Sequence, residues 1–428
     1  MSFLKTKSLP TFMWLLPVSF FTYQFILRLW PSLMMQDIMQ QFAIDASGFG
    51  SLAAAYYYGY SFMQIPLAIL FDRYGVRIVL GACSLLTGLA TLIFSNTDSL
   101  LIATLSRACV GIGSAAGFLA VSKVTSEWFV KSEYARMVGF SFTIGLMGAV
   151  YGGKPVSLLI EDLGGREVSY TLAMVSIAIG IATLVFLRRP SALDLDPRVS
   201  SDLLRSPGQV REKESSFKIT DFKALLSSKT IWLLGISNFL MVGSLEGFAD
   251  VWGVSYLQTA HGLTKGDAAQ LCSLIFVGMI FGGPILATFA AKFGNYNVIS
   301  FAGFTIAIVM FMMLLTGFEF NWYLFATLFL IIGVMCCYQV LVFAIGCDLM
   351  APELLSVTIA FLQTMNMIGG SFFHTIIGSI MDRFWTGKMD GLVRVYSLES
   401  YEWALMLIPT CAVFGALIVL FIGRKRKS

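Results

Sequence analysis

Long apolar runs, separated by glycine, proline or clusters of charge, make up most of this chain of 428 residues. Runs of about 20 apolar residues predict membrane-crossing helices, because inside lipid only helices or closed barrels satisfy every backbone polar group. Barrel strands would alternate apolar and polar residues, and runs such as residues 306–315 do not alternate. We therefore expect an all-α membrane protein with 12 transmembrane helices.

The predicted spans form two groups of six, separated by a polar stretch. The first group covers residues 11–36, 48–71, 78–95, 99–122, 136–160 and 167–187, and the second covers 230–257, 266–291, 296–317, 322–346, 354–379 and 402–423. The stretch between them is rich in charge and proline, which is typical of a polar linker. We expect an N-terminal half of residues 1–187, a cytoplasmic linker of residues 188–229 and a C-terminal half of residues 230–428.

A weak internal repeat relates the two halves. Trp14 recurs as Trp232 and Pro66 recurs as Pro284, both at an offset of 218 residues. Tandem halves of six helices are the layout of secondary transporters, in which the substrate site lies between the repeats. The repeat therefore predicts a site at the interface of two pseudo-symmetric halves.

Charge sets the expected orientation. Only 13% of residues are charged and 57% are hydrophobic, so lipid is the expected solvent of most of the chain. With the N-terminus in the cytoplasm, 21 Lys and Arg fall on the cytoplasmic side and five on the outer side. Because cytoplasmic loops carry the excess of Lys and Arg, we expect both termini in the cytoplasm. The chain lacks glycosylation sequons, and we expect a multi-pass protein of a bacterial inner membrane.

Other classes of protein find little support in the sequence. The seven cysteines lack metal-ligand spacing, and we predict neither a metal site nor a disulfide framework. An enzyme is not expected, because the sequence shows no nucleophile with its base and no phosphate loop. We expect no organic cofactor and no nucleic-acid partner, but a monomer whose partners are a small-molecule substrate and the lipid bilayer. A non-transporting membrane sensor or scaffold is a further alternative.

Three motifs of the first half resemble a known superfamily. The run from Asp72 to Arg77, after the second predicted span, resembles the cytoplasmic loop signature of the major facilitator superfamily. Arg107 with the glycines that follow it, and a glycine pattern between Gly145 and Gly153, are similar to further motifs of that superfamily. The resemblance implies a major facilitator fold, in which the first and seventh helices line a central cavity.

A narrower resemblance points to a substrate. The run from Arg28 to Pro31, the tyrosines between Tyr56 and Tyr60, and the run from residue 122 to 129 resemble the phagosomal transporter (Pht) family. That family comprises importers of amino acids, and in some members of nucleosides, in intracellular proteobacteria. The resemblance implies uptake of an amino acid.

Three charges in predicted spans are candidate substrate-binding residues. A charge at membrane depth costs at least about 2.5 kcal/mol, so it is expected to face the interior and to pair or bind a ligand. Glu246 is the repeat counterpart of Arg28, and Asp250 follows Glu246 by four residues, on the same face of a helix. A guanidinium facing two carboxylates suits a zwitterion. The alternative is a permanent salt bridge between Arg28 and Glu246 that holds the halves together in one state.

Proton coupling is assigned to Glu246, Asp250 and Arg107, because a carboxylate beside another carboxylate in a desolvated site can take up a proton. The alternative is a facilitator with no ion gradient. His374 is a further candidate proton carrier, against the alternative of a polar packing residue.

Depth within the spans adds further candidates. The uncharged substrate-binding candidates are Tyr23, Tyr57, Asn238, Gln339 and Asn366. Asp72, Arg73 and Arg77 are predicted to form a cytoplasmic gate, in which an ion pair to the opposite half holds the outward-open state.

The sequence thus predicts a secondary active transporter that imports a small zwitterion, first of all an amino acid, by alternating access and with protons. The proton gradient is the expected driving force. The alternative transport reading is an organic anion, a short peptide, a nucleoside or a siderophore, with export as an open direction.

Overall fold

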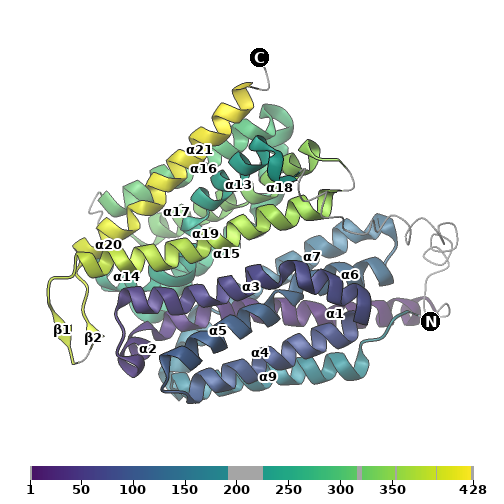
Figure 1. Ribbon diagram of the computed structural model, residues 1–428, viewed down its shortest axis with the longest axis horizontal. Helices are drawn as coiled ribbons and strands as arrows, with labels where there is room; N and C mark the ends of the chain where they lie inside the picture. The colour runs from purple at the N-terminus through teal and green to yellow at the C-terminus, as the bar shows by residue number, and fades with distance from the viewer. Residues whose placement is uncertain (1, 191–224, 316–320, 352–353, 392, 426–428) are drawn as a thin grey trace.

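The computed structural model describes residues 2–190, 225–315, 321–351, 354–391 and 393–425. Nearly all of these residues lie in helices, which form two bundles (Figure 1). The N-terminal bundle consists of α1 (Ser2–Leu29), η1 (Trp30–Met34), α2 (Met35–Phe42), α3 (Ala46–Tyr74), α4 (Val76–Asn96), α5 (Leu100–Ser114), α6 (Ala116–Trp128), α7 (Lys131–Tyr151), α8 (Lys154–Leu163) and α9 (Gly165–Phe186). Residues 191–224, most of the predicted linker, lie outside the described residues.

The second bundle follows the linker. It consists of α13 (Lys229–Met241), η2 (Gly243–Trp252), α14 (Gly253–His261), α15 (Lys265–Phe293), α16 (Asn295–Leu315), α17 (Trp322–Cys336), α18 (Tyr338–Leu349), α19 (Leu355–Arg383), α20 (Leu398–Leu405) and α21 (Leu407–Lys425). A short hairpin joins α19 to α20, in which β1 (Met389–Asp390) pairs antiparallel with β2 (Val393–Arg394).

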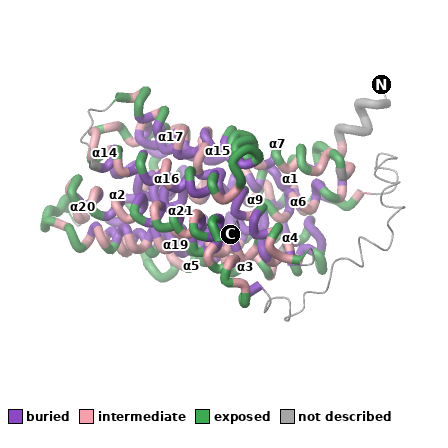
Figure 2. Tube along the Cα trace, turned by 90° about the horizontal axis from the view of Figure 1, so that it is seen from above, coloured by how far each residue is buried: buried purple, intermediate pink, exposed green. Residues whose placement is uncertain are grey.

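Ten helical stretches of the described chain are long and apolar enough to cross a membrane. Several of them combine two elements, such as Leu100–Trp128, which contains α5 and α6. Two further helices of 29 residues each, α3 and α19, occupy the segments predicted at 48–71 and 354–379. Buried and exposed positions interchange along the helices (Figure 2), as expected for bundles with one face packed and one face toward lipid.

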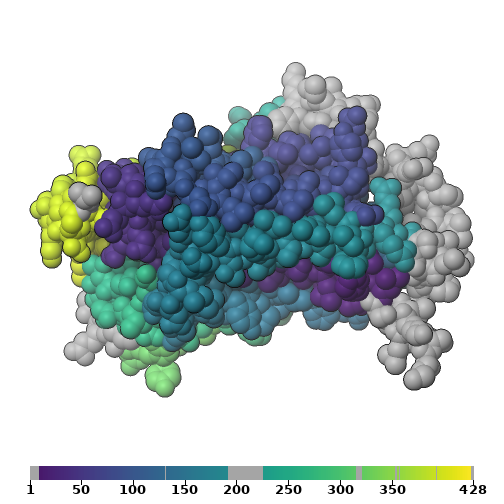
Figure 3. Space-filling view, turned by 90° about the horizontal axis from the view of Figure 1, so that it is seen from below, coloured from purple at the N-terminus to yellow at the C-terminus, as the bar shows by residue number. Residues whose placement is uncertain are grey.

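The two bundles converge at one end of the molecule and diverge toward the other (Figure 1). We call the first the hairpin end, because it carries β1 and β2, and the second the terminal end, because α1 begins and α21 ends there. The hairpin projects beyond the bundles next to α2 (Figure 3). The shape gives the molecule one closed end and one end where the halves stand apart.

The contact between α3 and α19 is the most extensive between the halves. Two small residues permit it: a Cβ at Gly50 of α3 would overlap the carbonyl of His374, and a Cβ at Gly378 of α19 would overlap the carbonyl of Ala46. Helices that lack a side chain at the contact bring their backbones close together. This close approach places the C-terminal part of α19 beside the N-terminal part of α3.

Short breaks interrupt several spans. The 3₁₀-helical turn η1, with Pro31 at its start, separates α1 from α2, and Gly152 and Gly153 separate α7 from α8. Proline and glycine are the residues expected where a membrane helix is interrupted. The first break ends α1 directly after Arg28 and Leu29, so that Arg28 lies next to an interrupted helix.

Candidate substrate-binding site

Arg28 and two carboxylates of the opposite half form a buried ion cluster. The Nε of Arg28 lies 2.5 Å from Oδ2 of Asp250, and its Nη2 lies 3.0 Å from Oδ1 of the same carboxylate. The Nη2 also lies 2.9 Å from Oε2 of Glu246. Two parallel contacts to Asp250 are the bidentate geometry that a guanidinium and a carboxylate favour. The structure therefore joins one cation of the N-terminal bundle to two anions of the C-terminal bundle.

Both carboxylates lie in η2, which is a π-helical stretch where the sequence predicted an ordinary α-helix. In a π-helix each amide bonds the carbonyl five residues earlier, as the amide of Gly253 bonds the carbonyl of Phe248. Glycine is a poor α-helix former, and Gly243 and Gly247 leave room for the ring of Phe373 against this turn. The wider turn still presents both acidic side chains to Arg28. Helical turns of this kind are rare and occur frequently at functional sites.

The hydroxyl of Tyr57 contacts both carboxylates of the cluster. It is within hydrogen-bond distance of Oε2 of Glu246 and of Oδ2 of Asp250. One hydroxyl supplies one proton, so it donates fully to only one carboxylate. The second contact is best satisfied when that carboxyl carries a proton of its own and donates to the tyrosine oxygen. The arrangement can therefore hold one additional proton between the two acidic groups.

Arg107 is a second buried cation, and its surroundings differ from those of Arg28. It is 2% exposed, donates to the carbonyl of Leu27 at 3.0 Å and lies over the ring of Tyr56 at 5.3 Å. Among the described residues no carboxylate lies within ion-pair distance of it, and its Nε has no hydrogen-bond partner. A buried charge without a counter-ion is costly, so an anion from outside the protein would be stabilised here.

The uncharged candidates are spread over both bundles. The hydroxyl of Tyr23 donates to the carbonyl of Leu172 at 2.5 Å, within the N-terminal bundle and not toward the ion cluster. Asn238 donates to the carbonyl of Leu362 at 3.1 Å. The Oδ1 atoms of Asn238 and Asn366 and the Nε2 of Gln339 are buried without a hydrogen-bond partner in the described part of the chain. Of the five uncharged candidates, the structure brings Tyr57 into contact with the ion cluster.

The three gate candidates make their contacts inside the N-terminal bundle. Asp72 pairs with Lys123, and Arg73 lies over the ring of Tyr74 at 5.2 Å. Arg77 donates from Nε to the carbonyl of Leu184 at 2.6 Å. The ion pair of Asp72 thus lies within one half in this structure, in the last turn of α3. A lock to the opposite half stays a prediction for another conformation.

A second set of contacts between the halves was not predicted. Asp382 of α19 accepts from the amides of Ala46 and Ser47, at 3.3 and 2.8 Å, at the N-terminus of α3. Arg394 of the hairpin lies 3.1 Å from Asp382 and 3.4 Å from Asp45. We call Asp45, Asp382 and Arg394 the hairpin latch. Nothing in helical periodicity joins residues so far apart in the chain.

Lys154 completes the contacts toward the hairpin end. Its Nζ lies 2.9 Å from Oδ1 of Asp267 in the other half. The sequence signal was present in this case, because a lysine inside a predicted span calls for a partner, but the identity of that partner could not be read from spacing.

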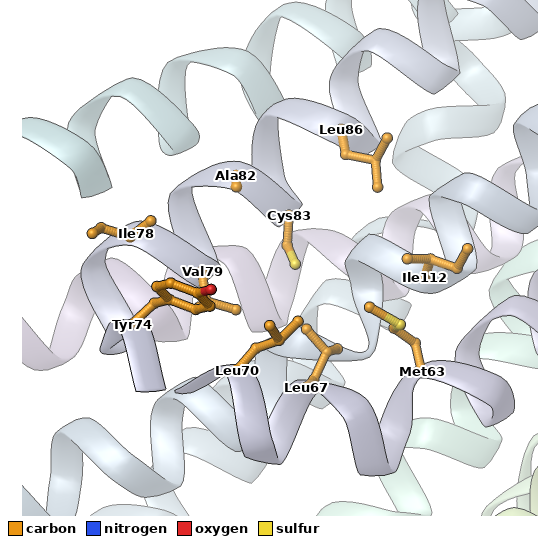
Figure 4. Close-up of a pocket in the computed structure, with 10 residues that line it drawn as sticks. All are labelled: Met63, Leu67, Leu70, Tyr74, Ile78, Val79, Ala82, Cys83, Leu86 and Ile112. Carbon is orange, nitrogen blue, oxygen red and sulfur yellow. The ribbon is translucent and has the colours of Figure 1, made fainter. Parts of the chain in front are cut away.

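An apolar groove lies apart from all these polar groups. It has a volume of about 360 Å³ and lies between α3, α4 and α5 (Figure 4). Its walls are formed by Met63, Leu67, Leu70, Tyr74, Ile78, Val79, Ala82, Cys83, Leu86 and Ile112. These side chains offer no cation and no amide, so the groove is unsuited to a charged solute.

Comparison with known proteins agrees with this geometry. The sequence profile of the Major Facilitator Superfamily matches residues 15–374 of the chain. The chain belongs to the Major Facilitator Superfamily. Members of this superfamily are membrane transporters and not enzymes, which agrees with the fold and with the motifs around Asp72 and Arg107.

Several relatives are named for organic acids. A probable L-galactonate transporter of Escherichia coli is 23% identical over 258 residues, which is 58% of this chain and 55% of the relative. A probable sulfoacetate transporter of Cupriavidus necator is 24% identical over 267 residues, or 61% of each chain. A probable galactarate/D-glucarate transporter of Escherichia coli is 22% identical over 61% of this chain and 62% of its own. The chain thus spans little more than half the length of these relatives.

Solved structures show the same fold over nearly the whole chain. A bacterial homologue of the human lysosomal transporter Spinster, in an inward-facing and occupied conformation, matches with a TM-score of 0.76 at 17% identity, over 98% of this chain and 97% of that one. The nucleoside transporter NupG matches with a TM-score of 0.73 at 13% identity, over 96% and 99% of the two chains. The likeness shows the major facilitator fold, as the sequence predicted.

Proposed function

We propose that the chain is a secondary transporter that takes up a small organic anion with at least one carboxylate or similar acidic group, together with protons. The single observation that carries this proposal is Arg107, a buried guanidinium without a carboxylate partner in the described part of the chain. An acidic group of the substrate would supply the missing counter-ion through charge-assisted hydrogen bonds. The organic acids in the names of the relatives support the same class of substrate.

The driving reaction is proposed to be proton symport through Glu246 and Asp250. Both carboxylates contact Arg28 and the Tyr57 hydroxyl. The two carboxylates and the hydroxyl can together bind one additional proton. A proton that enters this group weakens the hold on Arg28, because a neutral carboxyl attracts a guanidinium less than a carboxylate does. Loosening Arg28 would loosen the contact between the halves, which is the step that alternating access requires.

The predicted orientation of the termini sets which end of the molecule we propose to face the cytoplasm. With both termini in the cytoplasm, the hairpin end faces outside and the diverging terminal end faces the cytoplasm. The present arrangement then corresponds to a state closed toward the outside. A bacterial inner membrane is the proposed location, since the described chain is a multi-pass membrane protein.

A zwitterionic amino acid is the second candidate. The observation that favours it is the carboxylate pair itself: Glu246 and Asp250 carry two negative charges against the one positive charge of Arg28, which leaves an acceptor for an ammonium group. Arg107 would offer a cation for the carboxylate of the amino acid. The resemblance to the phagosomal transporter family supports the same class and stays a prediction.

The experiment is a thermal-shift screen of the purified protein with L-galactonate, sulfoacetate, glucarate, alanine and glutamate, repeated with Arg107→Gln. A ligand at 100 times its Kd raises stability by about 2.7 kcal/mol, enough for a clear shift in Tm. We expect a shift from an organic acid in the wild type and none in Arg107→Gln. Arg166→Gln, a surface variant outside the cluster, is the matched control and should keep the shift.

A shift from alanine or glutamate with none from the organic acids would select the second candidate. A shift that is equal in the wild type and in Arg107→Gln would overturn the role of Arg107. Nucleosides and dipeptides complete the screen, and binding of these alone would contradict both candidates.

A further inference from the structure

His374 is a buried histidine that the proposed transport mechanism does not use. It lies in the C-terminal half of α19, is 1% exposed, and its Nε2 lies 2.6 Å from the backbone carbonyl of Glu246 in η2. A carbonyl oxygen only accepts, so the Nε2 must carry the hydrogen and donate it. The bond fixes the tautomer of the ring, and it joins α19 to the residue that bears one of the two carboxylates.

A second ring contact and one backbone contact fix the position of His374. Its edge-on contact with the ring of Tyr57 has a centroid separation of 4.9 Å and an interplanar angle of 87°. The backbone carbonyl of His374 lies against Gly50 of α3, which has no side chain to hold it off. Through Tyr57 of α3 and the carbonyl of Glu246 in η2, the imidazole contacts both halves.

The partner of the Nε2 hydrogen belongs to the π-helical stretch. Such stretches seldom extend beyond one turn, because their geometry is less favourable than that of an α-helix, so a long one needs support from its surroundings. The described η2 runs from Gly243 to Trp252. A donor from α19 to the carbonyl of Glu246 supplies such support at the point where the carboxylate side chain leaves the backbone.

We propose that His374 is a positioning residue: its Nε2 hydrogen bond holds η2 in the π-helical register that lets Glu246 and Asp250 reach Arg28 and Tyr57 together. The proposal rests on the proposed function only in taking this cluster as the site of substrate and proton binding. His374 acts as a hydrogen-bond donor and not as a carrier of protons. The unpartnered Nδ1, buried in the described interior, has no role in this step.

Three substitutions separate the donor from the ring. His374→Gln retains an N–H donor near the place of Nε2 and cannot titrate. His374→Phe retains a ring against Tyr57 and removes the donor. His374→Asn has an amide that is too short to reach the carbonyl, and it serves as the donor-free variant if the Phe variant does not fold. Thr375→Val is the control, because the Thr375 hydroxyl donates to the carbonyl of Ser371 within its own helix.

The first readout is hydrogen–deuterium exchange of peptides that cover residues 243–253, which needs no substrate. We expect exchange to rise by about tenfold in the Phe and Asn variants, which corresponds to the loss of one net hydrogen bond, and to stay at the wild-type level in the Gln and Val variants. Wild-type exchange in all the His374 variants would overturn the proposal, and so would a Gln variant that exchanges as fast as the Phe variant.

The second readout is proton-driven uptake in proteoliposomes. We expect the Gln variant to retain uptake, and the Phe variant to show reduced uptake with a raised KM. If the Gln variant shows wild-type hydrogen–deuterium exchange but no uptake, the imidazole itself carries protons. This result would overturn a purely positional role of His374. If the wild type takes up none of the tested acids, the proposed function fails, while the exchange pattern still decides the role of His374.

Discussion

Arg107 is the residue whose environment constrains the substrate most, and it also carries a cost. A buried cation without a carboxylate partner loses the favourable interaction with water. One carbonyl and the face of Tyr56 replace only part of that interaction energy. Such strain is tolerated at binding sites and usually lowers stability there. Arg107 thus links affinity for an anion to instability of the empty protein.

We predict that Arg107→Met raises the unfolding temperature of the empty protein and abolishes binding of organic anions. Removal of the buried charge should stabilise the fold by about 1 kcal/mol or more, because apolar replacements of buried ionic groups are often stabilising. The measurement is thermal unfolding in detergent with and without ligand. A variant with a lower Tm than the wild type would show that the contacts of Arg107 outweigh its desolvation.

The two acidic residues make a different prediction. Glu246→Gln or Asp250→Asn should abolish accumulation driven by a pH gradient and leave equilibrium exchange of substrate intact, because exchange needs no net proton movement. Uptake of labelled substrate into proteoliposomes measures both modes. Glu161→Gln, exposed on α8, is the control. Full accumulation in both site variants would show that Glu246 and Asp250 do not carry the coupled proton.

Among the elements, the hairpin between α19 and α20 is the feature that holds the closed end. Asp382 places a negative charge at the N-terminus of α3, where the helix dipole and the amides of Ala46 and Ser47 favour it. Arg394 bridges Asp382 to Asp45. None of the residues of the hairpin latch belongs to the ion cluster around Arg28. The hairpin latch is therefore a separate determinant of which end is open.

We predict that Asp382→Asn shifts the conformational equilibrium toward opening of the hairpin end by about tenfold, because the amide loses the charge–dipole interaction and the ion pair to Arg394. Spin labels at positions 98 and 399, both exposed at that end, would report the change as a longer distance by pulsed electron resonance. Asp162→Asn, exposed on α8, should leave the distance unchanged. An unaltered distance in Asp382→Asn would exclude the latch.

The pH dependence of this latch follows from Asp45. Burial alone would raise its pKa, but the amide of Gly48, the hydroxyl of Ser47 and the charge of Arg394 together hold the pKa of Asp45 below its ordinary value. A lowered pKa means that the contribution is complete above the ordinary value of about 3.9 and is lost only as the pH falls below it. We expect the distance between labels 98 and 399 to stay constant from pH 7 to about pH 4 and to lengthen below that, with no such transition in Asp45→Asn.

Periodicity was sufficient for the helices, and much less so for the site. The offset of 218 residues between Arg28 and Glu246 pointed to a facing pair, and the structure places the two side chains in contact. The π-helical register of η2 could not be predicted, because it depends on packing against Phe373 and His374 of α19. The contact of Tyr57 with the ion cluster could not be predicted either. Neighbouring tyrosines point to different sides of α3, and the sequence does not show which side faces η2.

At the scale of the whole molecule, the orientation in the membrane is open to a direct test. Position 390 in β1 is exposed at the hairpin end, whereas α21 ends at Lys425 on the terminal end. In a variant without native cysteines, Asp390→Cys should react with a membrane-impermeant maleimide in intact cells. Lys425→Cys should react only after the cells are broken. The reverse pattern would place the hairpin end in the cytoplasm and contradict the predicted orientation.

The charges of the central site have a consequence for energetics. Arg28 and Arg107 carry two positive charges and Glu246 and Asp250 carry two negative ones, so the empty, deprotonated carrier has an electroneutral centre. Each elementary charge that crosses 100 mV exchanges about 2.3 kcal/mol with the field, and this centre exchanges none when it reorients. A monoanion that enters with one proton is neutral too. The transport rate of such a carrier would not depend on the membrane potential. It would accumulate substrate in a depolarised cell as long as a pH difference across the membrane remains.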